Sequence, residues 1–321
     1  MPSTAFTRRL VVDLVPTKNI HVVTNATHAK MVSEQLPNMP SINILQEPCA
    51  RDTAPCIGLA AAYIHQIDPD AIMLIMPSDH LIKPTEKFHQ AVKAAAEIVS
   101  QEDTLVTFGI TPKYPATAYG YIEKNDRKMI QNGLSVYPVK KFKEKPDENT
   151  AKKFVESNQY FWNAGIFVWK AKYILSLFKE LMPELSAGLE KLSIAKFSNL
   201  EEIYPKLPKI SIDFAIMEKA KSVKVIGVDY DWDDIGSWES LINHYAIDND
   251  NNLNKGAIAH LDSKNCIVIN DDEKSIITTI GLNNLLIVKS GNAILIADRN
   301  KGQDIKKLID ELKTKKLNDF L

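Results

Sequence analysis

The chain has 321 residues and a formal net charge of −1, and 45% of its residues are hydrophobic while 25% are charged. This composition is ordinary for a globular protein, and the length allows one large domain plus a smaller one. The balanced charge excludes a strongly basic nucleic-acid surface or a polybasic membrane patch, and no apolar run approaches the roughly 20 residues that span a bilayer. The three cysteines form no disulfide framework or close metal-binding pair, and the first residues show no signal peptide, so we expect a cytoplasmic location.

The first third of the chain alternates short apolar runs with amphipathic segments. The apolar runs predict strands at residues 20–23, 42–45, 72–76 and 104–108. Apolar residues at helical spacing predict helices at 54–67 and 86–99. This alternation favours a largely parallel sheet with helices on both faces.

The pattern changes after residue 119. Further strands are predicted at 121–123 and 136–142, around an exposed Asn132-Gly133 turn, and at 161–169 and 223–228. A helix is predicted at 171–182, and residues 183–208 are interpreted as a partly helical surface excursion.

The last seventy residues have a different composition. Residues 248–254 are rich in Asp and Asn and are interpreted as a linker. Closely spaced short strands then predict a small β unit, at 257–260, 266–269, 275–279, 285–289 and 293–297. A helix over 301–317 closes the chain.

Two carboxylates follow buried strands. The run 72–76 reads as a strand buried on both faces, ended by Pro77, and Asp79 and His80 come next. Asp234 lies in an acidic cluster after the strand at 223–228. Ligands bind beyond the carboxyl ends of strands in open α/β sheets, and Mg²⁺ is usually held by one or two carboxylates plus substrate phosphates. The alternative is that each aspartate caps a following helix, but the pair favours a metal, with His80 in a supporting hydrogen-bonded role.

Other polar residues also lie at the ends of predicted elements. Lys145 offers a charge that offsets phosphate, and Glu144 can accept hydrogen bonds from sugar hydroxyls, although a solvated charge run is the alternative. The loop 47–55 opens a helix whose free N–H groups favour anions, although Asp52 or Thr53 could simply be its N-cap. Asn163 lies between aromatic residues, which suits sugar binding but is also common in packed strands.

Eight motifs, taken together, carry a resemblance to a known family. They occur in this order: Glu47-Pro48 with Arg51-Asp52-Thr53-Ala54-Pro55, Pro77-Ser78-Asp79-His80, Phe108-Gly109-Ile110, Tyr119-Gly120-Tyr121-Ile122-Glu123, Phe142-Lys143-Glu144-Lys145-Pro146, Trp162-Asn163-Ala164-Gly165, Ile210-Ser211-Ile212-Asp213 and Trp232-Asp233-Asp234-Ile235-Gly236-Ser237-Trp238. The set resembles the mannose-1-phosphate guanylyltransferases, or GDP-mannose pyrophosphorylases, of the sugar-nucleotidyltransferase family. The similarity covers nearly the whole chain.

The resemblance implies a fold and a domain organisation. It implies an α/β protein with a Rossmann-like (GT-A-like) nucleotidyltransferase mixed sheet, helices on both faces and a small C-terminal left-handed β-helix fragment. The expected domains are residues 1–250, the nucleotidyltransferase domain, and 251–321, the β-helix-like unit with its C-terminal helix. Such β units often serve in self-association, so the resemblance implies a homodimer through this unit.

The resemblance also implies a reaction. GMP passes from GTP to mannose 1-phosphate, giving GDP-mannose and pyrophosphate, by in-line attack without a covalent intermediate. By motif position Asp79 and Asp234 hold Mg²⁺, and Lys145 neutralises phosphate. The substrates are GTP and mannose 1-phosphate, with no nucleic acid or membrane as partner.

The implied substrate-binding residues divide between mannose and nucleotide. The mannose contacts are Glu144, Asn163 and the backbone at Gly120. On the nucleotide side are Glu47, Arg51 and Thr53, with Glu47 facing the base. A carboxylate can accept from both N1–H and the exocyclic amine of guanine, a pair that adenine does not offer.

The resemblance has a gap at the start of the chain. The family begins with a strand and a glycine-rich loop around the triphosphate, and this sequence contains no Gly-x-Gly. We therefore expect a shortened nucleotidyltransferase domain, in which the backbone donors and acceptors of the strands at 20–23 and 72–76 need new partners, because the family's first strand lies between these two strands. Asp52 and Ala118 stand where asparagine and glycine are usual. The alternative function is a catalytically silent paralogue that binds a nucleotide sugar or an active partner subunit.

Overall fold

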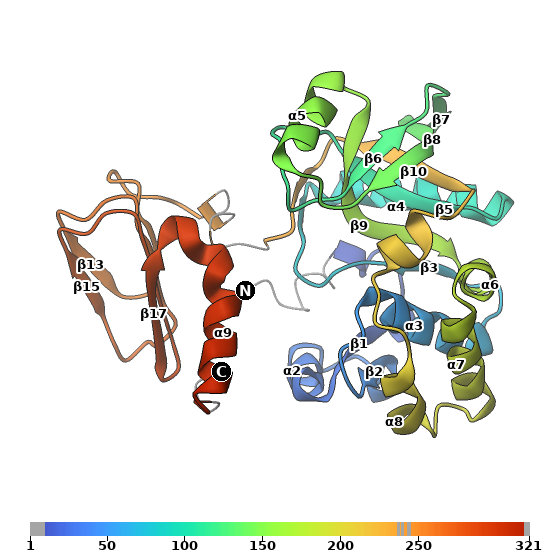
Figure 1. The fold of residues 1–321 in the computed structure, drawn as a ribbon, viewed down its shortest axis with the longest axis horizontal. Coiled ribbons are helices and arrows are strands. Elements are labelled where there is room, and N and C mark those ends of the chain that lie inside the picture. The colour runs from blue at the N-terminus through green and yellow to red at the C-terminus, as the bar shows by residue number, and fades with distance from the viewer. Residues whose placement is uncertain (1–9, 236–237, 239–240, 243–244, 318–321) are drawn as a thin grey trace. The chain divides into compact units, whose positions relative to one another are not determined.

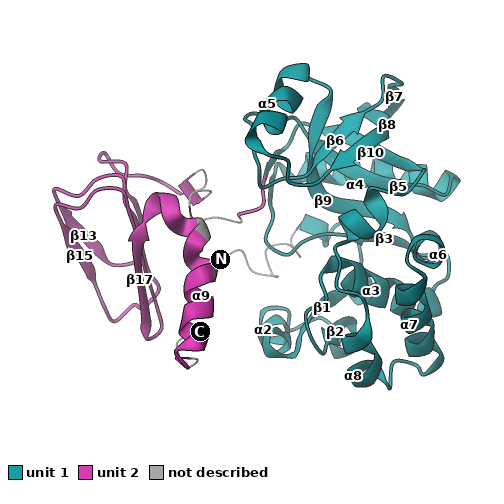
Figure 2. Ribbon diagram, viewed as in Figure 1, with its two compact units in different colours: residues 1–232 teal, residues 233–321 magenta. Residues whose placement is uncertain are grey.

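The structure, a computed structural model, describes residues 10–235, 238, 241–242 and 245–317 (Figure 1). Contacts between residues divide the chain into two compact units, Met1–Trp232 and Asp233–Leu321 (Figure 2). Within the described residues, no helix combines the length and the apolar character needed to cross a bilayer.

A seven-stranded mixed sheet forms the centre of the first unit. Its strands follow the order β10-β5-β9-β6-β8-β7, with β3 also paired to β9. They are β3 (Ile72–Ile75), β5 (Leu105–Ile110), β6 (Tyr121–Lys124), β7 (Met129–Gln131), β8 (Leu134–Lys143), β9 (Tyr160–Lys170) and β10 (Val223–Val228). Among the described strands of this sheet only β5 and β10 pair in parallel, so the expectation of a largely parallel sheet is wrong. The Asn132-Gly133 turn, with positive φ at both residues, folds β7 onto β8 as a hairpin, and hairpins make neighbouring strands antiparallel.

Two strands near the start of the chain have open edges. β1 (Val22–Asn25) pairs in parallel with β2 (Ile44–Glu47) in a separate two-stranded sheet, against which α2 (Ala26–Gln35) packs. Within the described residues β1 pairs only with β2, and β3 only with β9, so among these residues neither strand has the new partner strand that its free backbone groups were expected to need. The interpretation of 72–76 as a strand buried on both faces is wrong, because Ile72 is 41% exposed at this edge.

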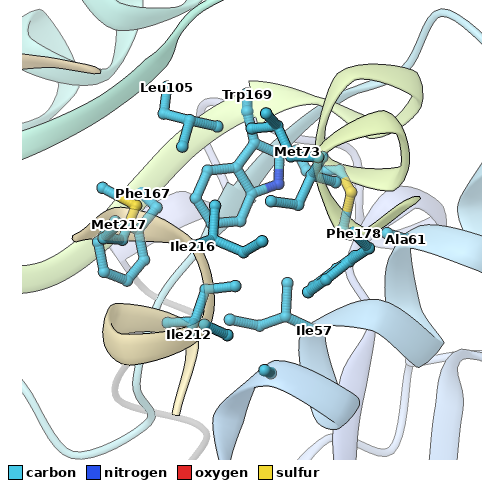
Figure 3. Close-up of a cluster of buried hydrophobic side chains, with 14 of the residues drawn as sticks. Ile57, Ala61, Met73, Leu105, Phe167, Trp169, Phe178, Ile212, Ile216 and Met217 are labelled. Atoms are coloured by element: carbon cyan, nitrogen blue, oxygen red, sulfur yellow. The ribbon is translucent and has the colours of Figure 1, made fainter. Parts of the chain in front are cut away.

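Helices cover both faces of the large sheet, as expected. α3 (Thr53–Ile67), α6 (Ala171–Leu181) and α7 (Pro183–Ile194) pack together on one face, and α4 (Thr85–Gln101) covers the other. Side chains along β9 alternate between the two cores: Phe167 and Trp169 enter the first, whereas Ile166 and Val168 enter the second. Figure 3 shows Trp169 and Phe167 in the first of these cores.

The segment 183–208 is part of the core, so its interpretation as a surface excursion is wrong. It forms α7, the short α8 (Leu200–Ile203) and a 3₁₀ turn at Tyr204–Lys206. Its buried side chains are Leu185, Leu189, Leu192, Tyr204 and Leu207. A further helix, α5 (Glu148–Ser157), was not predicted; it begins at Asp147, whose carboxylate accepts a hydrogen bond from Thr150 N.

The second unit consists mainly of stacked parallel strands, as in a β-helix. One ladder contains β12 (Leu253–Lys255), β14 (Ile267–Asn270) and β16 (Leu285–Ser290), and the other contains β13 (Ile258–Leu261) and β15 (Ile277–Ile280). β17 (Ala293–Asp298) closes the first ladder antiparallel, and α9 (Ile305–Thr314) follows a 3₁₀ turn at Arg299–Asp304.

The predicted linker at 248–254 is also wrong in part. Asn252 and Leu253 are each 1% exposed. The Asn252 amide donates to Ser263 O and accepts from Cys266 N, so it ties the start of the ladder to the next coil. The Asp and Asn residues here make local hydrogen bonds within a folded segment. A linker has the same composition, so composition alone could not distinguish the two.

Candidate active site

Asn163, on β9, lies at the centre of a hydrogen-bonded cluster at one end of the large sheet. Its Oδ1 accepts from Gly165 N at 3.1 Å and from the Thr107 hydroxyl at 3.2 Å, and its Nδ2 donates to Asp213 Oδ1 at 3.0 Å. Its backbone N–H donates to Gly120 O at 2.8 Å. The backbone donor at Gly165 fixes which end of the amide carries oxygen, so Nδ2 must face Asp213.

Glu144 and Gly120 lie against this cluster. A Cβ at position 120 would collide with the Glu144 carboxylate, so with any residue other than glycine the Glu144 side chain would have to shift from this position. Burial raises the pKa of Glu144 above its ordinary range, and the charge of Lys145 partly opposes that effect. The Lys145 ammonium is 3.7 Å from Glu144 Oε1.

Lys145 has an unusual backbone conformation. Its φ is +44°, in the left-handed region that residues with a Cβ rarely adopt, while its side chain is 66% exposed. Strain of this kind is concentrated at functional sites, where the surrounding structure holds it in place. The conformation therefore supports a functional role for the Glu144-Lys145 pair.

Asp213 was part of a quoted motif but had no predicted role. It begins a π-helix, Asp213–Met217, whose Ile216 and Met217 side chains are buried together with Ile212 in the core (Figure 3). Burial, followed by the negative charge of Glu144, raises the pKa of Asp213 to about 7. A π-helical turn is often found at functional sites, and so are carboxyl groups with raised pKa values.

The raised pKa of Asp213 predicts a pH-dependent stability. The unfolded chain releases this proton near pH 3.8, whereas the folded protein keeps it up to about pH 7, so the stabilisation is complete below pH 3.8 and is lost as the pH rises through 7. The side-chain amide of the Asp213→Asn variant cannot titrate, so the variant should gain stability relative to the parent between pH 4 and 8. The gain is up to about 4 kcal/mol, for a shift of about three pKa units. Chemical unfolding at a series of pH values measures it, and a difference that does not change with pH would contradict the prediction.

His80 and Asp79 lie next to this cluster. His80 is buried, accepts at Nδ1 from Trp232 Nε1 at 3.2 Å, and has its ring near Gly165. Asp79 is exposed and has no hydrogen-bond or ion-pair partner within the described part of the chain. It does not cap a helix, because the strand β4 (Leu81–Lys83) follows, paired with β11 (Asp231–Asp233), and Pro84 precedes α4.

The predicted pair of metal ligands is divided between the two units. Asp79 belongs to the first unit and Asp234 to the second, and the residues 236 and 237, where the helix capped by Asp234 in the alternative interpretation would begin, lie outside the described residues. Among the described residues, no group of three or more His, Cys, Asp or Glu could hold a metal ion. The exposed carboxylate of Asp79 supplies the oxygen atoms that Mg²⁺ prefers as ligands. Few protein ligands are needed for Mg²⁺, because substrate phosphates usually complete its ligand set.

Glu47 and Thr53 are held by the segment that leads to Asp213. The Tyr204 hydroxyl donates to Glu47 Oε2 at 2.6 Å, and burial and Glu47 raise the pKa of Tyr204, which therefore stays protonated. The Thr53 hydroxyl accepts from Ile212 N at 2.8 Å. The residues predicted on the nucleotide side and those predicted on the sugar side are thus joined through residues 204–213.

Arg51 and Asp52 precede α3. The Arg51 Nε is buried without a hydrogen-bond partner among the described residues, an unsatisfied donor of the kind a bound ligand can complete. Asp52 is the N-cap and accepts from Thr53 N, as the alternative interpretation of this loop expected. Its φ of 64° and ψ of −173° fall in a region that is essentially restricted to glycine.

This conformation makes Asp52 a source of strain. Replacement by glycine should raise the free energy of unfolding by about 1 kcal/mol, because the relief of backbone strain exceeds the few tenths lost at the cap. Replacement by alanine keeps the strain and removes the cap, so Asp52→Ala should be less stable than the parent. Chemical denaturation of the two variants measures the difference, and an Asp52→Gly variant that is no more stable than Asp52→Ala would contradict the prediction.

The fold agrees with comparisons to known proteins. The family model described as nucleotidyl transferase matches residues 11–251, and the chain belongs to this family. A second model, described as MannoseP isomerase/GMP-like beta-helix domain, matches residues 256–312. The expected fold class, a nucleotidyltransferase domain followed by a β-helix-like unit, is therefore confirmed.

Individual relatives carry more specific names. The chain is 36% identical to mannose-1-phosphate guanylyltransferases of Klebsiella pneumoniae and of Escherichia coli, over 93% of its own length and 64% of theirs. It thus spans less than two thirds of the length of these relatives. A solved structure titled mannose-1-phosphate geranyltransferase, from Thermus thermophilus, superposes with a TM-score of 0.82 at 28% identity, covering 96% of this chain and 88% of that one. A Helicobacter pylori structure titled mannose-6-phosphate isomerase gives a TM-score of 0.61 at 27% identity, over 72% of this chain and 89% of that one.

Proposed function

We propose that the chain transfers GMP from GTP to mannose 1-phosphate, giving GDP-mannose and pyrophosphate. The observation that carries the proposal is the cluster of Gly120, Glu144 and Asn163, with Lys145 beside it, in a chain similar along 93% of its length to guanylyltransferases of that name. Three of the six proposed substrate-binding residues lie in this cluster, and Glu47, Arg51 and Thr53 lie around the loop before α3.

The reaction needs positioning and charge neutralisation. An oxygen of mannose 1-phosphate forms a bond to the α-phosphorus of GTP, while the bond to the bridging oxygen breaks and pyrophosphate leaves with the electron pair. Lys145, whose ammonium is largely exposed, neutralises phosphate charge. Glu144 and Asn163 hold sugar hydroxyls, and Gly120 lets the two approach each other closely.

The nucleotide side has a defined hydrogen-bonding pattern. The Tyr204 hydroxyl occupies one of the acceptor sites of Glu47 Oε2. The remaining acceptor sites of the Glu47 carboxylate can accept from guanine N1–H and from the exocyclic amine. The buried Arg51 Nε supplies a donor for the nucleotide, and Thr53 keeps the loop in place through Ile212.

Asp79 and Asp234 would hold Mg²⁺, which supplies positive charge to the GTP phosphates when it is bound. The unpaired carboxylate of Asp79 supports this proposal. For the rest of the molecule we propose a domain boundary after residue 250, supported by family matches that end at 251 and restart at 256. We also propose a cytoplasmic location, in keeping with three free cysteines.

We propose a homodimer through the C-terminal β unit. Ile280 on β15 and Ile294 and Ile296 on β17 are 71%, 63% and 66% exposed. Large apolar side chains exposed on regular strands often mark an interaction surface. Sedimentation of the parent chain and of a variant with serine at these three positions distinguishes a dimer from a monomer.

A substrate panel tests the function. The full chain is incubated with Mg²⁺, each of the four nucleoside triphosphates and the 1-phosphates of mannose, glucose and galactose, and pyrophosphate release is followed. Release with GTP and mannose 1-phosphate above all other pairs is the expected result. Faster release with another pair would replace the assigned substrates. No release with any pair would support the silent paralogue, which calorimetry with GDP-mannose would then detect as binding without turnover.

A further inference from the structure

We propose that Asp213 is a further sugar-binding residue, and that its carboxyl group and the Asn163 amide together receive one hydroxyl of the sugar. This inference rests on the proposed function, since it takes the cluster around Asn163 as the sugar site. No role was assigned to Asp213 from its motif, and the argument depends on its contacts.

The Asn163 amide has one donor to spare. Its oxygen accepts from Gly165 N and lies 3.2 Å from the Thr107 hydroxyl, whose single proton is shared with Ile166 O, and one of its two Nδ2 protons goes to Asp213. The other Nδ2 proton has no partner among the described residues. A half-buried N–H beside a cluster of carboxyl groups is a strong donor for a ligand oxygen.

The Asp213 carboxyl group has acceptor capacity to spare. It accepts from Asn163 and from its own backbone N–H, and in the ionised form, which predominates above about pH 7, it offers about four acceptor sites. Its spare acceptors therefore lie next to the spare Asn163 donor. A hydroxyl group, which donates one proton and accepts others, satisfies both at once.

The charges around Asp213 favour a ligand rich in hydroxyl groups. The charged groups that act on it are Glu144, which repels a second negative charge, and Lys145, which attracts it. Two carboxyl groups so close together are costly unless donors are supplied to them, and a sugar supplies several. An anion would instead be repelled, so the phosphate end of the substrate must lie away from Asp213, toward Lys145.

The platform that holds Asp213 is rigid. Ile212, Ile216 and Met217 are buried in the core that also contains Ile57 and Phe167 (Figure 3). Ile212 N is in addition bonded to Thr53. The buried side chains and the hydrogen bond to Thr53 thus fix the position of the Asp213 carboxyl group. A carboxyl group in a fixed position can discriminate between hydroxyl groups at different positions of the sugar ring.

A cycle of variants and deoxy sugars tests the proposal. Calorimetry measures the binding of GDP-mannose, and of its 2-, 3-, 4- and 6-deoxymannose analogues, to the full-length parent chain and to Asp213→Ala. The expected result is about ten- to hundredfold weaker binding of GDP-mannose by the variant, the range for a hydrogen bond to a charged group. For one deoxy analogue, the one that lacks the contacted hydroxyl, parent and variant should bind within about twofold of each other.

Two further variants complete the design. Asp213→Asn keeps the acceptor for Asn163 and should retain part of the affinity, and thermal unfolding checks that every variant is folded. Glu218→Gln is the matched control, because Glu218 is an exposed carboxylate that acts on Glu144 without contacting Asn163. It should bind all ligands within about twofold of the parent.

The outcomes separate the inference from the proposed function. An equal loss with every analogue, or no loss with GDP-mannose, overturns the role of Asp213. The calorimetry measures binding and does not depend on turnover. If no pyrophosphate is released in the activity assay, the proposed reaction is rejected, but the binding data still test the role of Asp213. A parent chain that does not bind GDP-mannose overturns both.

Discussion

Replacement of Asp79 by asparagine is expected to lower kcat/KM for GDP-mannose formation by about 10²- to 10³-fold, the loss typical when a fixed charge-stabilising group is removed from a reaction centre. Asparagine keeps the shape of the side chain but removes its negative charge, and hard divalent cations bind charged oxygen more strongly than amide oxygen. Asp79 is exposed and has no partner within the described residues, so the substitution breaks no interaction that supports the fold. The free energy of unfolding should therefore change little.

Steady-state rates at several Mg²⁺ concentrations measure this effect. The loss should become smaller as Mg²⁺ is raised, because mass action offsets a weakened site. The control is Asp229→Asn, which removes an exposed carboxylate paired with Lys87 and should change kcat/KM by no more than about twofold. Equal rates for Asp79→Asn and the parent would contradict the role of Asp79.

Replacement of Lys145 by methionine is expected to reduce kcat/KM by about 10²- to 10³-fold as well. Methionine fills much of the space of the lysine stem but carries no charge, so negative charge that builds on the phosphates is no longer offset. A second effect follows from the contact with Glu144, whose pKa Lys145 holds down. In the variant the pKa of Glu144 should rise further, so the remaining activity should fall at low pH more than that of the parent.

The control for this experiment lies two residues away. Lys143 is exposed at the last position of β8, and Lys143→Met should leave kcat/KM within about twofold of the parent. Rates from pH 5 to 9 for both variants give the magnitude and the pH profile. Similar losses for Lys143→Met and Lys145→Met would show that the effect is one of general charge and not of position.

Periodicity predicted most elements because the core-facing residues of each element repeat at its own period. α4 is the clearest case: the predicted range 86–99 contains Phe88, Val92, Ala95 and Val99 at helical spacing, and all four are buried. The partners of each strand could not be predicted in the same way, since pairing depends on contacts far apart in sequence. The antiparallel position of β9 beside β5 and β3 is such a contact, and for that reason the largely parallel sheet was a wrong prediction.

The misinterpreted segment 183–208 did contain a usable signal. Leu185, Leu189 and Leu192 recur at helical spacing and all face the core. The segment also contains Pro205, Pro208 and many charged residues, a composition typical of surface segments. To assign the segment to the core, the helical spacing of these leucines would have to be taken as stronger evidence than the polar composition.

The candidate site depended on the resemblance more than on any local pattern. Glu144 and Asn163 were each ambiguous alone, and their convergence on Gly120 follows from the pairing of β6 with β8 and β9. Tyr204 and Glu47 are 157 positions apart, and no spacing rule predicts their hydrogen bond. Asp213 was missed because its motif contains one carboxylate and no other chemical signal.

We propose that Asp79 and Asp234 are ligands of one divalent cation, and a binding measurement on the full chain tests this most directly. Mn²⁺ in place of Mg²⁺, with α,β-methylene GTP to prevent transfer, allows the bound ion to be titrated by the relaxation of water protons. The measurement compares the full-length parent chain with Asp79→Asn, Asp234→Asn and the double variant. We expect each single variant to weaken Mn²⁺ binding by at least about tenfold, and the double variant to be far less impaired than the product of the two losses, because both remove ligands of one ion. Parent-like binding by either single variant, or losses that multiply as independent effects, would contradict a shared ion.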